Sequence, residues 1–302
     1  MKLQTRNCSI LHGICAGAIL LLTATITAQA QYEYTTLSVP GAVITFASGI
    51  SGDNVVGYYL SSSGIDSSYL YNGGTYTTFS FPGAWETFAN GVSGDTVAGY
   101  YGTSAGGTYG FLYNNGAFIT LNVPGADETE VFGISGNNVV GECWGSNGAQ
   151  AFLYNGSTYS ILTGFGSSFV PYAVSGNNVL GGSGNASMLY NGSTYTPVSF
   201  PGASVTRAYG MDGNNIVGME SENGDHGFLY DGSTYTSFDV PGATGTYAFG
   251  ISSNNIVGDY TADVGGVLGF LATPVPVPEP SCLALLGLGA SVVTLRLRAM
   301  RP

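Results

Sequence analysis

Short apolar segments separated by turn residues recur along the chain at a nearly constant spacing. The segment from Tyr76 to Gly83 reads YTTFSFPG, and five related segments begin at Tyr34, Phe118, Tyr159, Tyr195 and Tyr235. Their closing glycines are 42, 42, 41, 36 and 40 residues apart. Self-similarity at one period of this length indicates a repeat architecture.

Each repeat contains four such segments, and none of them has a helical period. In the second repeat they cover residues 87–94, 97–101, 109–114 and 118–125. All are rich in Val, Ile, Phe, Tyr and Thr, and Gly, Asn and Asp lie between them, so we predict four strands per repeat. The apolar content is nearly continuous, which suits sheets that are covered on both faces.

Four short strands in about 40 residues are typical of a propeller blade. The body begins with a fourth strand alone (34–39) and ends with the first three strands (247–271). We therefore predict an all-β fold: a six-bladed β-propeller over residues 31–273, built from four-stranded repeats and closed by the N-terminal strand joining the last blade. An open β-solenoid is the alternative, but it does not explain this three-plus-one division.

Residues 1–30 have the features of a secretory signal peptide. Lys2 and Arg6 form a basic start, residues 10–26 are apolar, and Ala28-Gln-Ala30 provides small residues at the cleavage positions. The mature chain is expected to begin at Gln31. A retained anchor helix is the alternative, and the Ala-x-Ala site argues against it because strand-like sequence follows at once.

The C-terminal part predicts an extended stalk and a membrane segment. Residues 274–281 are rich in proline, and residues 282–302 combine an apolar run with Arg296, Arg298 and Arg301. The run is short for a transmembrane helix, and its basic end is expected to stay cytoplasmic.

The motif Pro278-Glu279-Pro280, followed by the apolar run and the basic tail, resembles the PEP-CTERM sorting signal over residues 276–302. The resemblance implies processing near the motif by an exosortase, a membrane transpeptidase. The protein would then be released or transferred to the cell surface or to the extracellular matrix of a biofilm. A plain C-terminal membrane anchor is the alternative.

The repeats carry a second resemblance. The segment from Ala208 to Gly218, followed by His226-Gly-Phe-Leu-Tyr230, resembles the HAF family of extracellular bacterial repeats. The corresponding tripeptides at Tyr109 and Gln150 lack the histidine. The resemblance implies a secreted repeat protein and no established chemistry.

The charge and the reactive side chains of the body restrict the classes of function and ligand that it can have. Residues 31–273 contain Arg207 as the one base against 17 acids, a net charge of −16, which disfavours nucleic acid and anionic lipid. Cys143 and His226 are the only cysteine and histidine of this body, too few for a disulfide framework, a catalytic triad or a zinc site. We expect Cys143 to be buried and His226 to be solvated.

We predict no catalytic, cofactor-binding or metal-binding residues. Ca²⁺ is the one metal worth considering, because carboxylates cluster in residues 127–130 and 220–225. Neither cluster has the spacing of a known calcium loop.

These observations favour a non-enzymatic cell-surface or matrix protein, with exopolysaccharide as a candidate ligand of the propeller loops. Six aromatic residues are able to stack on sugars if they face the loops, with packing between blades as the alternative: Tyr58, Tyr59, Tyr100, Tyr101, Trp85 and Trp144. A secreted glycoside hydrolase or lyase is the alternative function. Two close carboxyl groups with raised pKa in a cleft would favour the enzyme, and a rim of Tyr and Asn would favour binding.

Overall fold

The computed structural model describes residues 32–64, 66–163, 169–263 and 266–275, and every regular element within them is a β-strand. The signal peptide and its cleavage residues Ala28, Ala30 and Gln31 lie outside the described residues. The same holds for Pro278, Glu279, Pro280, Arg296, Arg298 and Arg301 of the sorting signal. Within the described residues, no helix is long and apolar enough to cross a membrane.

Four separate sheets have four strands each, in the order first, second, third and fourth strand of a repeat. The first two consist of β2 (Ala42–Ser51), β3 (Asn54–Ser61), β4 (Asp66–Asn72), β5 (Thr75–Phe79), and β6 (Glu86–Ser93), β7 (Thr96–Gly102), β8 (Thr108–Asn114), β9 (Ala117–Leu121). The next two consist of β10 (Glu128–Ser135), β11 (Asn138–Gly145), β12 (Gly148–Tyr154), β13 (Tyr159–Ile161), and β14 (Val170–Ser175), β15 (Asn178–Ser183), β16 (Ala186–Tyr190), β17 (Tyr195–Val198).

The remaining eight strands form one sheet. They are β18 (Val205–Asp212), β19 (Asn215–Ser221), β20 (Asp225–Tyr230), β21 (Tyr235–Phe238), β22 (Ala243–Ser252), β23 (Asn255–Ala262), β24 (Val267–Pro274) and β1 (Tyr32–Leu37). The molecule is an all-β propeller, but the prediction of six separate blades is wrong: four blades are separate, and the last two repeats share a sheet.

A parallel contact joins the two halves of the eight-stranded sheet. Asp225 of β20 lies opposite Gly245 of β22, and the Tyr247 hydroxyl donates to Asp225 Oδ2 over 2.6 Å. Because Gly245 has no side chain, the start of β22 is able to approach the edge of β20 closely. The repeat pattern contains no signal for this junction.

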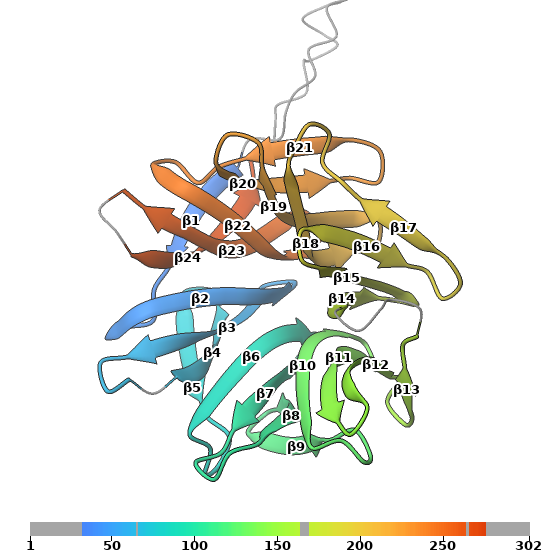
Figure 1. Ribbon diagram of the computed structural model, residues 1–302. Coiled ribbons are helices and arrows are strands. Elements are labelled where there is room, and N and C mark those ends of the chain that lie inside the picture. The colour runs from blue at the N-terminus through green and yellow to red at the C-terminus, as the bar shows by residue number, and fades with distance from the viewer. Residues whose placement is uncertain (1–31, 65, 164–168, 264–265, 276–302) are drawn as a thin grey trace, which may run out of the picture. The chain divides into compact units, whose positions relative to one another are not determined.

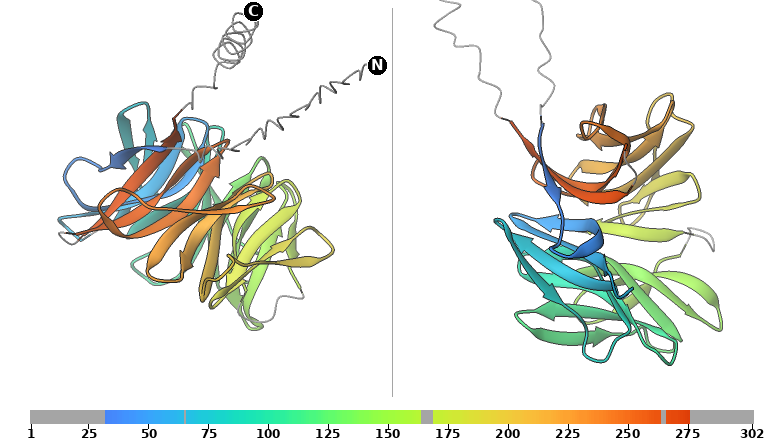
Figure 2. Two further views of the ribbon diagram at one scale, coloured as in Figure 1. Left: turned by 90° about the horizontal axis from the view of Figure 1, so that it is seen from above. Right: turned by 90° about the vertical axis from the view of Figure 1, so that its left-hand side faces the viewer.

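The predicted pairing of the N-terminal strand with the last three strands is confirmed. β1 runs antiparallel to β24 along its whole length, from Tyr32 opposite Pro274 to Leu37 opposite Gly269 (Figure 2). The first strands β2, β6, β10, β14, β18 and β22 each contact the next, and β22 contacts β2 (Figure 1). The strands therefore form a closed ring, which excludes the open solenoid.

Hydrogen bonds at the turns after the first strands also join successive repeats. In five of the junctions a backbone N–H donates to a side chain one repeat earlier: Gly94 to Ser51, Gly136 to Ser93, Gly213 to Ser175, Ser253 to Asp212, and Gly52 to Ser252. The last bond, 3.0 Å long, links the final repeat to the first.

A buried threonine fixes the connection between most successive repeats. The hydroxyl oxygens of Thr45, Thr87, Thr129, Thr206 and Thr246 accept from the backbone N–H six residues earlier. In the fourth repeat Phe169 occupies this position. The Pro-Gly turn between the two partners is thereby held against the start of the next first strand.

We expect Thr87→Val to lower the free energy of unfolding by about 1–3 kcal/mol, because the Phe81 N–H would lose its acceptor in a partly buried place. Thr77→Val is the matched control on exposed strand β5, with an expected change within about 0.5 kcal/mol. Urea denaturation of both variants measures the difference. Equal stabilities would contradict the structural role of the threonine.

Candidate functional site

A β-bulge in each first strand directs one side chain toward the centre of the ring. The register shifts by one residue in every repeat, so that one residue has no partner on the second strand. These six residues are Ser48, Asn90, Phe132, Tyr172, Tyr209 and Phe249, and all of them line one cavity. Bulges commonly redirect a side chain in this way.

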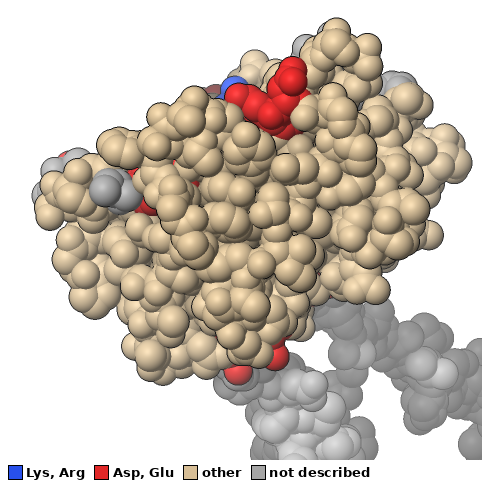
Figure 3. Space-filling view, turned by 90° about the horizontal axis from the view of Figure 1, so that it is seen from below, with Lys and Arg blue, Asp and Glu red and all other residues tan. Residues whose placement is uncertain are grey.

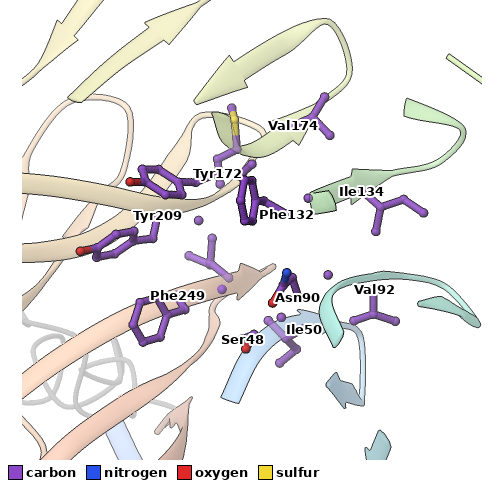
Figure 4. A pocket seen from close by; sticks show the side chains of 18 of the residues that line it. Ser48, Ile50, Asn90, Val92, Phe132, Ile134, Tyr172, Val174, Tyr209 and Phe249 are labelled. Atoms are coloured by element: carbon purple, nitrogen blue, oxygen red, sulfur yellow. The ribbon is translucent and has the colours of Figure 1, made fainter. Parts of the chain in front are cut away.

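Eight half-buried aromatic residues form a continuous series, which we call the aromatic belt, and all of them except Phe88 and Tyr100 line this cavity. In ring order they are Phe46, Tyr58, Phe88, Tyr100, Phe132, Tyr172, Tyr209 and Phe249. Neighbouring ring centroids lie 4.7 Å apart at Phe46–Tyr58 and 6.4 Å apart at Phe132–Tyr172. Figure 4 shows four of them around the cavity.

The axial cavity, as we call the space within the ring, has a volume of about 310 Å³. All six first strands contribute to its lining, and each of them supplies one aliphatic residue: Ile50, Val92, Ile134, Val174, Met211 and Ile251. A volume near 300 Å³ is at the lower end of the range for small-molecule sites. A ligand as small as one or two sugar rings would suit it.

The backbone beside the cavity is packed closely. Gly49, Gly91, Gly133, Gly210 and Gly250 follow the bulged residues, and a methyl group on Gly49 would lie 3.0 Å from the Asn90 carbonyl oxygen. Neighbouring first strands therefore touch through their backbones at this level. The glycines hold the bulged side chains at a fixed distance from one another.

Among the residues that the structure describes, Asp259 is the one acid that lines the axial cavity. It is 5 % exposed, and its Oδ1 accepts from the Ala47 N–H over 2.9 Å. Within the described residues, no hydrogen bond reaches Oδ2. Burial raises the pKa of Asp259 well above its usual range, although the hydrogen bond from Ala47 opposes the shift. The cavity thus holds one carboxyl group with an oxygen available to a ligand.

Two further acids lie opposite each other beside the aromatic belt. Glu130 of β10 faces Glu142 of β11 across the strand pair. Burial raises the pKa of Glu130 to about 7, and the charges of Glu142, Glu128 and Glu86 add to the shift. Burial also raises the pKa of Glu142. Neither carboxyl group lines the axial cavity.

The aromatic residues that the sequence offered as candidates for stacking on sugars lie in different parts of the structure. Tyr58 and Tyr100 belong to the belt, whereas Tyr101 is buried and stacks on Phe81 at 3.6 Å. Trp85 is 58 % exposed, and Trp144 lines a second cavity in the third repeat. Because successive strand residues point to opposite faces, only one tyrosine of each Tyr-Tyr pair joins the belt, and of these two Tyr58 lines the axial cavity whereas Tyr100 does not.

The expected burial of Cys143 is confirmed, as it is a free and buried cysteine. The His226 side chain is 33 % exposed, so it is partly solvated as expected, and its Nδ1 lies 2.8 Å from Asp239 Oδ2. This bond raises the pKa of His226. No three His, Cys, Asp or Glu side chains among the described residues converge on a metal position.

Charged groups are sparse on the surface as well. The face in Figure 3 shows mostly uncharged side chains with a few acids. Arg207 is exposed, and its Nη2 donates to Asn185 Oδ1 over 3.0 Å. The axial cavity is therefore defined by aromatic surface and one buried acid, with no basic residue in its lining.

The sequence alone did not identify the bulged residues as candidate site residues. The pattern that could have found them is Ala-x-Gly in the first strand, as in Ala47-Ser-Gly49 and Ala208-Tyr-Gly210. The flanking residues are Ala and Gly in four of the six repeats, whereas Val131-Phe-Gly133 and Pro171-Tyr-Ala173 depart from the pattern, and the middle residue varies among Ser, Asn, Phe and Tyr. Because the middle residue varies while most of its neighbours do not, the fold does not require a particular side chain at this position. Such a position is a candidate for a functional surface.

Comparison with known proteins adds to the description of the fold. No family model matches the chain, and no curated protein matches it significantly. The fucose-specific lectin from Aleuria aurantia is similar at 15 % identity and TM-score 0.48, over 82 % of this chain and 99 % of the lectin.

Two other structures are similar at the same level. A puromycin-hydrolyzing peptidase from Mycobacterium tuberculosis shares 10 % identity at TM-score 0.50, over 84 % of this chain and 57 % of the peptidase. The β-propeller domain of the Trilobed protease from Pyrococcus furiosus shares 8 % at TM-score 0.46, over 80 % and 98 %. Likeness at these identities concerns the fold and assigns no ligand.

Proposed function

We propose that this protein is a non-enzymatic carbohydrate-binding propeller whose axial cavity takes a sugar. The observation that supports the proposal is the aromatic belt around a cavity that contains a single buried acid. A pyranose ring has an apolar face that stacks on aromatic rings, and hydroxyl groups that need a few well-placed polar partners.

The polar partners are few and come from different repeats. Asp259 offers Oδ2, and Ser48, Asn90, Tyr172 and Tyr209 belong to the same lining. The Asn90 amide is held in place because its Nδ2 donates to the Val131 carbonyl oxygen over 2.8 Å. A fixed amide and a fixed carboxyl group orient a ligand at little entropic cost.

The location of this function is part of the proposal. An N-terminal signal peptide would export the chain, and exosortase processing at Pro278-Glu279-Pro280 would deliver it to the cell surface or the matrix. The exopolysaccharide of the producing cell is then the polymer that the propeller meets. Since the body carries −16, a neutral polymer, or an acidic one bridged by cations, suits it best.

The experiment that tests this function is co-sedimentation of the protein with that exopolysaccharide, with and without Ca²⁺. We expect saturable pelleting, weakened at least 10-fold by Phe132→Ala because the belt is interrupted. Phe118→Ala is the matched control, a half-buried aromatic residue on outer strand β9. Absence of pelleting, or equal pelleting of Phe132→Ala, would remove the axial cavity as the binding site.

A glycan-active enzyme is the second candidate, because Glu130 and Glu142 form a close carboxyl pair with raised pKa. Glycoside hydrolysis needs one protonated and one ionised carboxyl group. Here burial raises both pKa values in the same direction, and the pair does not line the axial cavity. Reducing-sugar release from the exopolysaccharide that disappears in Glu130→Gln would favour the enzyme over the binding protein.

A further inference from the structure

The third repeat contains a second cavity, which we call the Trp144 pocket, of about 590 Å³. Its lining comes from the turn between β9 and β10, the hairpin between β11 and β12, and strand β13 with the turn before it. The lining residues are 123–126, 143–147, Gln150, 157–159 and Ile161. None of them lines the axial cavity.

The repeat pattern breaks at this pocket. The position of Trp144 is occupied by Leu60, Gly102, Gly184, Ser221 and Thr261 in the other repeats. The position of Gln150 is occupied by Ser67, Tyr109, Ala186, His226 and Leu268. The fold is therefore compatible with much smaller residues where Trp144 lies, so the indole is not required to build a blade.

The lining offers aromatic faces together with unpaired polar groups. Trp144 and Tyr159 are half-buried, and Tyr159 is braced by Tyr154 at a centroid distance of 4.6 Å. Among the described residues, no side-chain hydrogen bond involves Trp144, Asn147 or Gln150. The indole N–H and two amide groups are thus available beside the two aromatic faces.

The uncharged lining of the pocket favours neutral ligands over charged ones. The lining contains no charged side chain, whereas the body around it carries −16. An anionic ligand would meet repulsion without a basic partner, and a cation would find no carboxylate in the lining. Aromatic faces with amide donors and acceptors, in an uncharged cavity of this size, fit a neutral saccharide.

We propose that the Trp144 pocket is a second saccharide site, specific for a neutral sugar unit. The inference rests on the proposed carbohydrate-binding function for its ligand class, but its residues are independent of the axial cavity. Two sites on one chain bind two units of one polymer, or bridge two polymers, and either mode raises the apparent affinity.

The test uses tryptophan fluorescence, since Trp85 and Trp144 are the only tryptophans in the chain. Trp85 is 58 % exposed, so Trp85→Phe leaves Trp144 as the sole reporter at little cost to the fold. This variant is titrated with maltose, cellobiose and galacturonic acid. We expect a saturable change in Trp144 emission with a neutral sugar and none with galacturonic acid.

Two variants in the Trp85→Phe background separate this site from the axial cavity. The double variant Asn147→Ala, Gln150→Ala removes two amides without partners and is expected to weaken the response at least 10-fold. Phe132→Ala is expected to leave the response unchanged, even where it weakens co-sedimentation.

Three outcomes would overturn the Trp144 pocket as a saccharide site: no saturable response to either neutral sugar, an undiminished response in the double variant, or loss of the response in Phe132→Ala. A response that persists while the axial cavity fails its own test would retain the pocket and remove the cavity.

Discussion

Gly141→Ala is expected to lower the melting temperature by about 6–12 °C, which corresponds to about 3 kcal/mol. Gly141 is the glycine of the Val-Val-Gly segment in second strand β11. A methyl group there would lie 1.9 Å from the Glu130 carbonyl oxygen and 2.9 Å from the Phe152 ring. Backbone on one side and a fully buried ring on the other leave no room for movement.

Gly145→Ala on the same strand is the matched control. The nearest atom to a methyl group at Gly145 is the Gly125 carbonyl oxygen at 3.4 Å, an ordinary contact distance. Differential scanning calorimetry of both variants gives the comparison. Equal melting temperatures would mean that the second strand is able to shift away from β10, against the close packing described above.

The same crowding occurs in all six repeats. Gly57, Gly99, Gly181, Gly218 and Gly258 occupy the corresponding position, and a methyl group on Gly99 would lie 1.9 Å from the Phe88 carbonyl oxygen. A glycine at one fixed strand position is typical of close backbone approach, as the short distances at these glycines show. Positions that are occupied by the same residue in every repeat reflect packing that every repeat needs.

The eight-stranded sheet was not predictable from the repeat pattern, because it depends on a contact that occurs in only one place. Asp225 and Gly245 belong to loops and strand ends that vary between repeats. A repeat pattern describes what the repeats share, so it predicts the four-stranded unit and its closure by β1. It does not predict a contact that occurs once, and the predicted six separate blades failed at that point.

The axial cavity was not predicted from the sequence, for a different reason. The bulge changes which face of the first strand a residue occupies, because one inserted residue reverses the alternation beyond it. Ser48 and Phe132 read in the sequence as ordinary strand positions. Their common direction into the cavity follows from the register shift, which depends on pairing with the second strand.

Asp259→Asn is expected to raise the melting temperature at pH 8 by about 4–8 °C, or about 2 kcal/mol, and to have little effect at about pH 3. Burial raises the pKa of Asp259 in the folded protein above its unfolded value of 3.8. Both states are protonated at the lowest pH, and the unfolded chain releases its proton first as the pH rises. Stability therefore falls from about pH 4 up to the raised pKa. The amide Oδ1 still accepts from the Ala47 N–H without carrying a charge.

The difference between the variant and the parent protein is the informative quantity, because other groups also respond to pH. Glu130, with its pKa raised to about 7, loses stabilisation in the same direction between about pH 4.5 and 7, and so does His226 as the pH rises through its raised pKa.

Asp53→Asn, at an exposed turn, is the control and should follow the parent at every pH. Melting temperatures measured from about pH 3 to 8 should therefore diverge for Asp259→Asn alone. Parallel curves would show that Asp259 ionises freely in the folded protein, and the axial cavity would then be wet and open rather than a shielded site that selects hydroxyl groups.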